Sequence, residues 1–206
     1  MNKKGIIAVI SGFSGAGKGT VVGELTKKYG YVVSVSATTR KPREGEEEGK
    51  SYFFKTKEEF ERMIEADELI EYAQYVGNYY GTPKAYVMEQ INQGKDVLLE
   101  IEMQGALKVR EKFPEVSLIF ITPPSVKELR RRLEKRGTEE AEVIDRRVAR
   151  AKEECAYMEA YDYIVENAGL DECVASLHGL LQAIHFSQNN QNELIEKIRK
   201  DFDQYQ

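Results

Sequence analysis

The sequence has few cysteines, no long apolar run and no excess of positive charge. Its two cysteines, Cys155 and Cys173, form no C-x-x-C pair and cannot build a zinc site alone, a usage that fits a reducing cytoplasm. No apolar run approaches the roughly 18 residues of a membrane span. The net charge of −5 argues against general nucleic-acid binding. We therefore expect a cytoplasmic protein that acts neither on nucleic acid nor within a membrane.

The chain has 206 residues, of which 41% are hydrophobic and 32% are charged. This balance is typical of a globular protein, and the length allows one core domain with insertions or at most two small domains. In an acidic chain, an anionic ligand must be held by locally concentrated positive charge. Residues 34–43 contain Arg40, Lys41 and Arg43 and no acid, and residues 125–152 are rich in lysine and arginine. In the arginine run 130–132, only one or two side chains can face the same ligand.

Short apolar runs alternate along the chain with segments of helical periodicity. Strands are predicted at residues 5–11, 32–36, 51–55, 69–76, 97–102, 117–121 and 163–165. Helices are predicted at residues 18–29, 56–66, 139–159 and 170–186, and Thr56 with Glu59 has the capping-box pattern. Strands that alternate with helices predict an α/β fold with a parallel sheet covered on both faces.

Residues 34–82 depart from this pattern, with short strands, loops and a predicted turn at 77–81. We expect this stretch to be an insertion that lies over the edge of the sheet. The two histidines, His178 and His185, fall on a late predicted helix. We expect both to be exposed or half-buried helix residues without a catalytic role.

The strongest motif is a glycine-rich loop at residues 12–18, Gly-Phe-Ser-Gly-Ala-Gly-Lys, between a predicted strand and a predicted helix. Glycines let successive backbone N–H groups point at phosphate oxygens, and the helix N-terminus adds partial positive charge. Lys18 can reach the β and γ oxygens of a nucleoside triphosphate. The strand–loop–helix context disfavours the alternative of a turn with a solvated lysine.

One position in this motif is unusual. The residue after the loop lysine is normally Ser or Thr, whose hydroxyl contacts Mg²⁺, but here it is Gly19. Thr20 lies about 100° further round the helix and cannot simply take over that contact. We expect Mg²⁺, bound with ATP, to be held by phosphates, waters and a carboxylate elsewhere in the chain.

Several further motifs follow the loop. They are SVSATTRKPR at 34–43, SYFF at 51–54, EYA at 71–73, GNYYGT at 77–82, EIEMQG at 100–105 and IFITPP at 119–124. In order and spacing they resemble the motifs of bacterial guanylate kinases, nucleoside monophosphate kinases with the P-loop NTPase fold. The resemblance extends from about residue 5 to about residue 186. It is far more specific than the loop alone, because several independent motifs agree.

The resemblance implies a three-layer P-loop fold with a central parallel sheet, a GMP-binding insertion and a small helical lid. The implied core is 1–33, 83–125 and 161–187, with the insertion at 34–82, the lid and its flanking helix at 126–160, and a helical tail at 188–206. The implied reaction is reversible transfer of the ATP γ-phosphate to GMP, giving ADP and GDP, with Mg²⁺ as cofactor. The partners are ATP and GMP, in a monomer or a homodimer.

The resemblance also assigns residues. The ATP site comprises Gly12, Phe13, Ser14, Gly15, Ala16, Gly17, Lys18, Gly19, Thr20 and Asn167. The GMP site comprises Ser36, Arg40, Arg43, Tyr52, Glu71, Tyr80, Thr82 and Glu102. The catalytic cations are Lys18, Arg40, Arg132, Arg136 and Arg147. No residue is assigned as a direct Mg²⁺ ligand, and Glu100 is the candidate for a contact through water. The pair Glu100 and Glu102 stands where the family often has two aspartates, and Thr82 stands where serine is common.

The residues also make chemical sense without the family. A phosphate acceptor is already ionised, so the reaction needs positioning and positive charge more than a base. Guanine presents N1–H and its N2 amine as adjacent donors, and an ionised Glu71 accepts from both. The hydroxyls of Ser36 and Thr82 can donate to guanine O6. Adenine would leave Glu71 unpaired, although Glu71 on an alternating strand is otherwise an ordinary polar position.

Two other functions are weighed against this one. Gly19-Thr20 resembles adenylate kinases and suggests an AMP kinase, but Glu71 and the Arg40 segment speak against it. A guanylate-kinase-like module that binds proteins without catalysis belongs to a different class. Such modules tend to have damaged phosphate loops, whereas the loop and the lid arginines are intact here. Turnover of ATP in the presence of GMP separates these readings.

Overall fold

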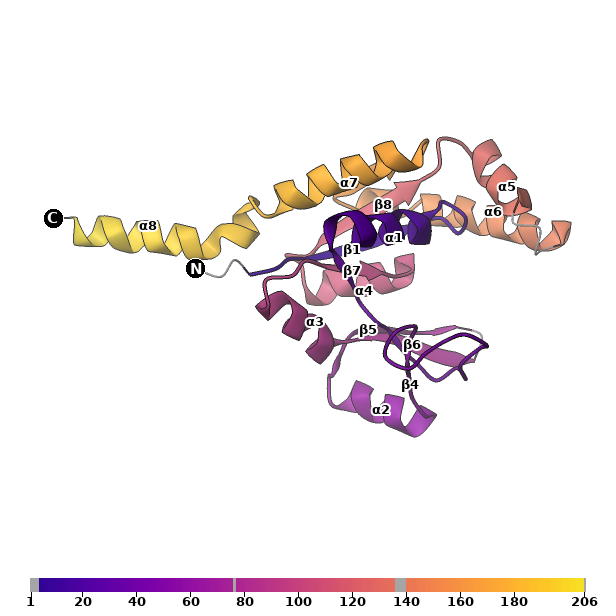
Figure 1. The fold of residues 1–206 in the computed structure, drawn as a ribbon, viewed down its shortest axis with the longest axis horizontal. Coiled ribbons are helices and arrows are strands. Elements are labelled where there is room, and N and C mark those ends of the chain that lie inside the picture. The colour runs from indigo at the N-terminus through magenta and orange to yellow at the C-terminus, as the bar shows by residue number, and fades with distance from the viewer. Residues whose placement is uncertain (1–3, 76, 136–139, 206) are drawn as a thin grey trace.

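Two β-sheets organise the chain, for which the computed structural model describes residues 4–75, 77–135 and 140–205. Within these ranges, a five-stranded parallel sheet has the strand order β2-β7-β1-β8-β9, and a four-stranded mixed sheet has the order β4-β3-β6-β5 (Figure 1). The parallel sheet consists of β1 (Ile7–Gly12), β2 (Val32–Val33), β7 (Val97–Glu100), β8 (Ser117–Thr122) and β9 (Tyr163–Glu166). The predicted parallel sheet is thus confirmed.

Strand β1 is the centre of the main core. Its Val9 pairs with Leu99 of β7 on one side and Leu118 of β8 on the other, and all three side chains have no exposed surface. A strand buried on both faces needs a continuous apolar run, which explains the sequence of this segment. Gly12, the last residue of β1, therefore lies at the carboxyl end of the parallel sheet, where ligands of open α/β folds bind.

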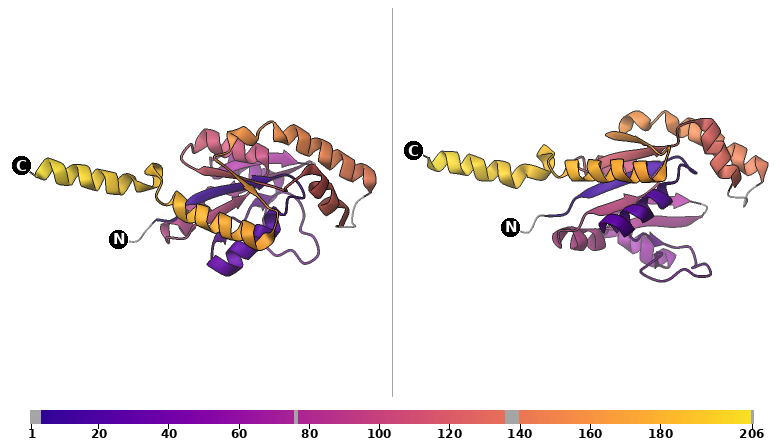
Figure 2. Two further views of the ribbon diagram at one scale, coloured as in Figure 1. Left: turned by 90° about the horizontal axis from the view of Figure 1, so that it is seen from above. Right: turned by 45° about the horizontal axis from the view of Figure 1, so that its top comes forward.

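Helices cover both faces of this sheet. The helices of this part of the chain are α1 (Lys18–Tyr29), α3 (Lys84–Asn92), α4 (Met103–Lys112), α5 (Val126–Lys135), α6 (Ala141–Cys155) and α7 (Leu170–Ile184), of which α5 packs against α6 beyond the end of the sheet (Figure 1). Helices α1 and α7 pack against each other on one face, and α4 lies on the opposite face, between the central sheet and β5 (Figures 1 and 2). This arrangement is the expected three-layer architecture.

The mixed sheet has a small core of its own. It consists of β3 (Ala37–Thr38), β4 (Phe53–Phe54), β5 (Leu69–Tyr75) and β6 (Asn78–Pro83), covered by α2 (Lys57–Glu65). Ala37, Phe60 and Leu69 are its buried centre, whereas Ile70 belongs to the main core. Strand β5 therefore contributes to both cores. The predicted capping box of α2 is present, because Thr56 Oγ1 accepts from the Glu59 N–H and a Glu59 carboxylate oxygen accepts from the Thr56 N–H.

Three sequence-based expectations need correction. The turn predicted at 77–81 is largely strand β6, which pairs with both β3 and β5; local Gly and Asn residues favour a turn, but two neighbouring strands stabilise the extended form. The helix predicted at 139–159 is α6 followed by a 3₁₀ turn, Met158–Ala160, and residue 139 lies outside the described residues. His185 is buried and pairs with Asp96 at 2.9 Å, because it closes the end of α7 against the start of β7.

The C-terminal tail protrudes from the body. After the 3₁₀ turn Gln188–Gln191, helix α8 (Asn192–Gln204) extends away from both sheets (Figures 1 and 2). Its Phe202 is 73% exposed. Among the residues that the structure describes, no helix combines the length and the apolar character that a membrane crossing requires.

Replacing Phe60 with alanine tests the small core. The Phe60 side chain is fully buried and stacks on Tyr79 at a centroid distance of 5.2 Å. We expect Phe60→Ala to lower the free energy of unfolding by about 3–5 kcal/mol. Urea denaturation measures this change. Phe202→Ala on the exposed helix α8 is the matched control and should stay within about 0.5 kcal/mol of the parent; similar losses in both variants would contradict a separate small core.

Candidate active site

The glycine-rich loop joins the end of β1 to the start of α1. Gly17 has the left-handed φ of 92°, and a Cβ there would lie 2.7 Å from Asn167 Nδ2, so only glycine fits. Phe13 packs edge-on against Phe120 at 4.9 Å and anchors the loop to the core. Lys18 Nζ donates to the Gly12 carbonyl at 2.7 Å, so its ammonium group folds back across the loop.

Polar side chains from three other elements meet this loop. Arg132 of α5 donates to the Ala16 carbonyl at 3.2 Å and to the Asn167 carbonyl at 2.7 Å. Asn167, after β9, donates through Nδ2 to the Ala16 carbonyl at 2.8 Å. Arg147 of α6 donates to Ser14 Oγ from Nη2 at 2.6 Å. The structure thus gathers two predicted catalytic arginines and Asn167 at one loop.

The neighbours of Arg132 have other partners. Arg130 pairs with Asp145 at 2.8 Å, and Arg131 pairs with Glu128 at 2.7 Å. Only Arg132 of this run contacts the loop, as the geometry of a helix requires. Arg136 lies outside the described residues.

A second group of predicted residues lies in the insertion. Arg40 donates from Nη2 to both Glu46 oxygens, at 2.7 and 3.0 Å, and its guanidinium lies over the Tyr52 ring at 5.3 Å. The Tyr52 and Tyr80 rings meet edge to face at 6.1 Å. Glu46 also accepts a hydrogen bond from the backbone N–H of Arg43, and Arg43 itself is exposed. The Arg40 guanidinium and the Arg43 N–H hold the pKa of Glu46 below its usual value.

The third predicted feature is a buried carboxylate. Glu71 on β5 is 6% exposed, and its Oε1 accepts from Thr82 Oγ1 of β6 at 2.8 Å. Thr82 is fully buried. Ser36 is half-buried just before β3, and its carbonyl accepts from the Phe53 N–H. The structure therefore brings Glu71 and Thr82 together, and the Thr82 hydroxyl donates its hydrogen bond to the Glu71 carboxylate.

Glu100 is the last residue of β7 and Glu102 comes shortly after it, at the same carboxyl end of the sheet as the loop. Glu102 is the N-cap residue of α4 and is exposed. A Cβ on Gly19 would lie 3.5 Å from Glu100 Oε1, so Gly19 faces this carboxylate, while Thr20 is exposed. The pKa of Glu100 is raised, mainly because its carboxylate is partly desolvated. The positive charge of Lys18 opposes this shift, and the negative charge of Glu102 adds to it. Glu100 remains exposed to solvent, so neighbouring atoms remove only part of the water around its carboxylate.

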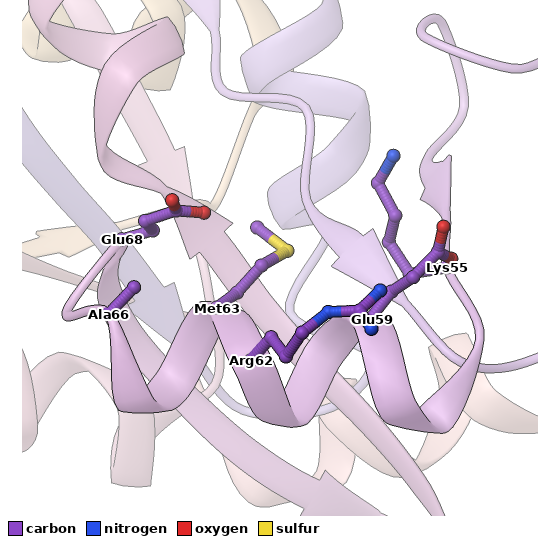
Figure 3. A pocket seen from close by; sticks show the side chains of 6 residues that line it. All are labelled: Lys55, Glu59, Arg62, Met63, Ala66 and Glu68. Carbon is purple, nitrogen blue, oxygen red and sulfur yellow. The ribbon is translucent and has the colours of Figure 1, made fainter.

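A surface hollow of about 520 Å³ lies away from all these residues. It lies along α2, and its wall consists of Lys55, Glu59, Arg62, Met63, Ala66 and Glu68 (Figure 3). The charged residues of this wall, Lys55, Glu59, Arg62 and Glu68, alternate in sign along the chain. None of the predicted site residues lines this hollow, so its volume does not mark the candidate active site.

Comparison with known proteins agrees with this arrangement. The family model described as "Guanylate kinase" matches residues 4–184. The guanylate kinase of Halalkalibacterium halodurans is 54% identical over 199 residues, covering 96% of each chain. That of Bacillus subtilis is 49% identical over 189 residues, covering 90% of this chain and 92% of the relative. The chain belongs to the guanylate kinase family.

A solved structure supports the same conclusion for the fold. The guanylate kinase of Anaplasma phagocytophilum superposes with a TM-score of 0.76 at 36% sequence identity, covering 97% of this chain and 96% of that one. The five-stranded parallel sheet and the separate mixed sheet are thus the fold of a guanylate kinase.

Two site-supporting carboxylates were missed by the sequence reasoning. Glu46 lies in an acidic stretch of the insertion, where nothing in the local pattern singles it out. Glu128 accepts from Arg132 Nε at 2.8 Å, and the Arg131 and Arg132 guanidiniums lower its pKa to about 2. The four-residue spacing from Glu128 to Arg132 is a recognisable signal for such a pair.

Ionisation of the buried Glu71 carboxylate lowers the stability of the folded protein. Burial raises the pKa of Glu71, whereas the Thr82 hydrogen bond and the charges of Lys108 and Lys112 on α4 lower it. Because its folded-state pKa is raised, the stability that Glu71 contributes is complete at low pH and is lost as pH rises through that pKa. A carboxylate can accept two hydrogen bonds from a ligand only in its ionised form, so ionisation of Glu71 for such a role would reduce the stability of the protein.

Replacing Glu71 with glutamine separates these effects. We expect Glu71→Gln to lower kcat/KM for GMP about 10- to 100-fold, the loss of hydrogen bonds to a charged group. Wild-type KM for GMP should rise as pH falls through the raised pKa of Glu71, and the variant should lack this rise. The variant's stability advantage over wild type should grow with pH. Steady-state kinetics and thermal unfolding between pH 5 and 8 measure both.

The GMP phosphate titrates near pH ~6 in both proteins and therefore cancels in the comparison. A variant that keeps wild-type kcat/KM at every pH would remove Glu71 from the acceptor site.

Proposed function

We propose that this chain transfers the γ-phosphate of ATP reversibly to GMP, giving ADP and GDP, with the two nucleotides held by the two groups of residues described above. The observation that carries this proposal is the separation of its cations. One group surrounds the glycine-rich loop, and the other lies in the insertion, which also carries the buried carboxylate of Glu71. A reaction between two phosphorylated substrates requires two such sites.

The donor site is built on the loop. In our proposal the backbone N–H groups of residues 12–17 and the start of α1 hold the ATP phosphates. Lys18, Arg132 and Arg147 neutralise the charge of the transferring group, and Asn167 borders the base or ribose. Each of these three cations now donates to a loop oxygen, within reach of the place where phosphate oxygens would bind.

The acceptor site runs from the phosphate to the base. Arg40 and Arg43 hold the GMP phosphate, with the hydroxyls of Tyr52 and Tyr80 as neutral donors. Planar guanidinium groups suit bidentate contacts to phosphate. Glu71 accepts from guanine N1–H and N2–H at the other end. Ser36 faces O6, Thr82 orients Glu71 through the hydrogen bond described above, and Glu102 borders the site at the start of α4.

Transfer itself needs no general base, because the acceptor phosphate is already ionised. The residues orient the two phosphates and stabilise the charge of the transferring group. Closure of the insertion and the lid over the sheet edge would exclude water, which otherwise competes as acceptor. Arg40 is paired with Glu46 before substrate binds, so the incoming phosphate must replace that carboxylate.

The residues present fit Mg²⁺ bound together with ATP. Mg²⁺ keeps several waters and typically takes one or two carboxylates plus substrate phosphates. Glu100 is an oxygen donor beside Lys18 and Gly19, and a contact through water suits it. Within the described residues no three His, Cys, Asp or Glu side chains gather as a metal site, so the nucleotide would supply the remaining ligands. The cation would supply charge neutralisation at the phosphates.

We also propose the division of the chain. Residues 1–33, 83–125 and 161–187 form the core, 34–82 the GMP-binding insertion, 126–160 the lid with its flanking helix, and 188–206 the tail. The separate small core of the insertion supports this division. The free thiols of Cys155 and Cys173 support a cytoplasmic enzyme, acting as a monomer or a homodimer.

The test is a coupled ADP-release assay with Mg-ATP and GMP, AMP, UMP or CMP. We expect GMP to be preferred over AMP by as much as ~10⁴, because AMP leaves the buried Glu71 unpaired. An AMP kinase would show the reverse preference. A protein-binding module would show no turnover with any acceptor.

Lys18→Ala tests the catalytic cation. We expect it to lower kcat about 10²- to 10³-fold while the thermal unfolding midpoint changes little, since Lys18 acts on charge that develops during transfer. Lys27→Ala, an exposed lysine of the same helix, is the control and should retain activity. Wild-type turnover in Lys18→Ala would show that the loop does not bind the transferring phosphate.

A further inference from the structure

Glu71 lies at an irregular point of strand β5. Leu69 pairs with Pro83 and Tyr72 pairs with Gly81, so β5 has one extra residue between these pairs. Such a β-bulge bends a strand and redirects its side chains, and bulges are frequent beside active sites. The bulge directs the Glu71 side chain into the interior, where it is 6% exposed. What holds this bulge therefore also determines where the carboxylate lies.

Helix α4 provides the surface against which Glu71 rests. A Cβ on Gly105 would lie 2.9 Å from Glu71 Oε2 and 3.4 Å from its Cδ, and the first of these distances is shorter than a Cβ tolerates. Oε1 is bound to Thr82 Oγ1 on the other side. The carboxylate is thus enclosed between β6 and the first turn of α4, whose dipole favours negative charge. Each oxygen keeps a further lone pair for a ligand donor.

One turn further along α4, Lys108 reaches the bulge itself. Its Nζ donates to the Tyr72 carbonyl at 2.7 Å and lies over the Tyr72 ring at 5.1 Å. Lys112, on the next turn, pairs at 3.1 Å with Asp67, which lies shortly before the start of β5. The core helix α4 therefore fixes the insertion strand on both sides of Glu71.

We propose that α4 is part of the guanine-recognition site: Gly105 leaves the space in which Glu71 Oε2 meets the base, and Lys108 is a positioning residue that holds the β5 bulge. The proposal rests on the proposed function, since it assumes that Glu71 binds guanine. It adds that the base is recognised at the junction of insertion and core. The base end of the acceptor site then stays with α4, while the phosphate end at Arg40 lies on the insertion alone.

Gly105→Ala is the first test. The added methyl group must displace the Glu71 carboxylate, so we expect Kd and KM for GMP to rise about tenfold or more, the loss of one charge-assisted hydrogen bond. KM for ATP should not change, and the preference for GMP over AMP should fall. Alanine is the better helix former, which offsets part of the cost of displacing the buried carboxylate, so the variant should remain folded. Titration calorimetry with GMP alone gives Kd without catalysis.

Two controls identify the cause. Gly179→Ala on α7 places a methyl group where nothing lies within 4 Å, and it should leave GMP binding unchanged. In the double variant Gly105→Ala/Glu71→Gln, the Gly105 effect should disappear, because both changes act on the same carboxylate. Additive losses, or wild-type GMP binding in Gly105→Ala, would overturn the role of Gly105.

Lys108 is tested separately, which keeps the proposal falsifiable should Gly105→Ala fold poorly. We expect Lys108→Met to raise KM for GMP about three- to tenfold with kcat retained at saturation, and Lys108→Arg to restore it, since arginine also donates to a carbonyl. Lys152→Met, at an exposed lysine of α6, is the control. An equal rise in KM for ATP, or no rise at all, would refute the positioning role. Absence of GMP phosphorylation in the wild type would instead refute the proposed function.

Discussion

Positive charge must be held in two places in a chain whose net charge is −5. Within each site, lysine and arginine side chains without partners would repel one another, and their conformations would not be fixed. Three of the cations in the described residues have oxygen partners: Lys18 the Gly12 carbonyl, Arg132 the Ala16 and Asn167 carbonyls, and Arg40 the Glu46 carboxylate. These oxygens occupy the donors before a phosphate arrives, so the side chains are oriented in advance. In our proposal, substrate phosphates exchange for these protein oxygens, which limits the entropy lost on binding.

The acceptor base imposes the opposite requirement, a negative charge in a buried place. Burial of Glu71 opposes its ionisation, and the structure compensates with the Thr82 hydroxyl, the nearby lysines of α4 and the N-terminal turn of that helix. Strand β5 contributes Leu69 to the small core and Ile70 to the main core, so Glu71 lies where the two meet. If Glu71 binds guanine as we propose, the choice of base depends on the junction between the core and the insertion.

Local signals explain what was predicted from the sequence. Helix α1 begins and ends at the predicted residues, because the glycine loop precedes it and Gly30 caps it with a left-handed φ of 75°. Apolar runs predicted the buried strands, and Thr56 with Glu59 predicted the start of α2. Strand β6 was missed because its stability comes from two distant strands. The Glu46 partner of Arg40 and the contact of Gly105 with Glu71 also depend on chain segments that only folding brings together.

The most direct test of this account is a crystal structure of the GMP complex. The account predicts that Arg40 has left Glu46 for the GMP phosphate, and that guanine N1 and N2 lie within hydrogen-bonding distance of a Glu71 carboxylate still resting against Gly105. A GMP molecule bound with the Arg40–Glu46 pair intact and its base away from Glu71 would contradict it.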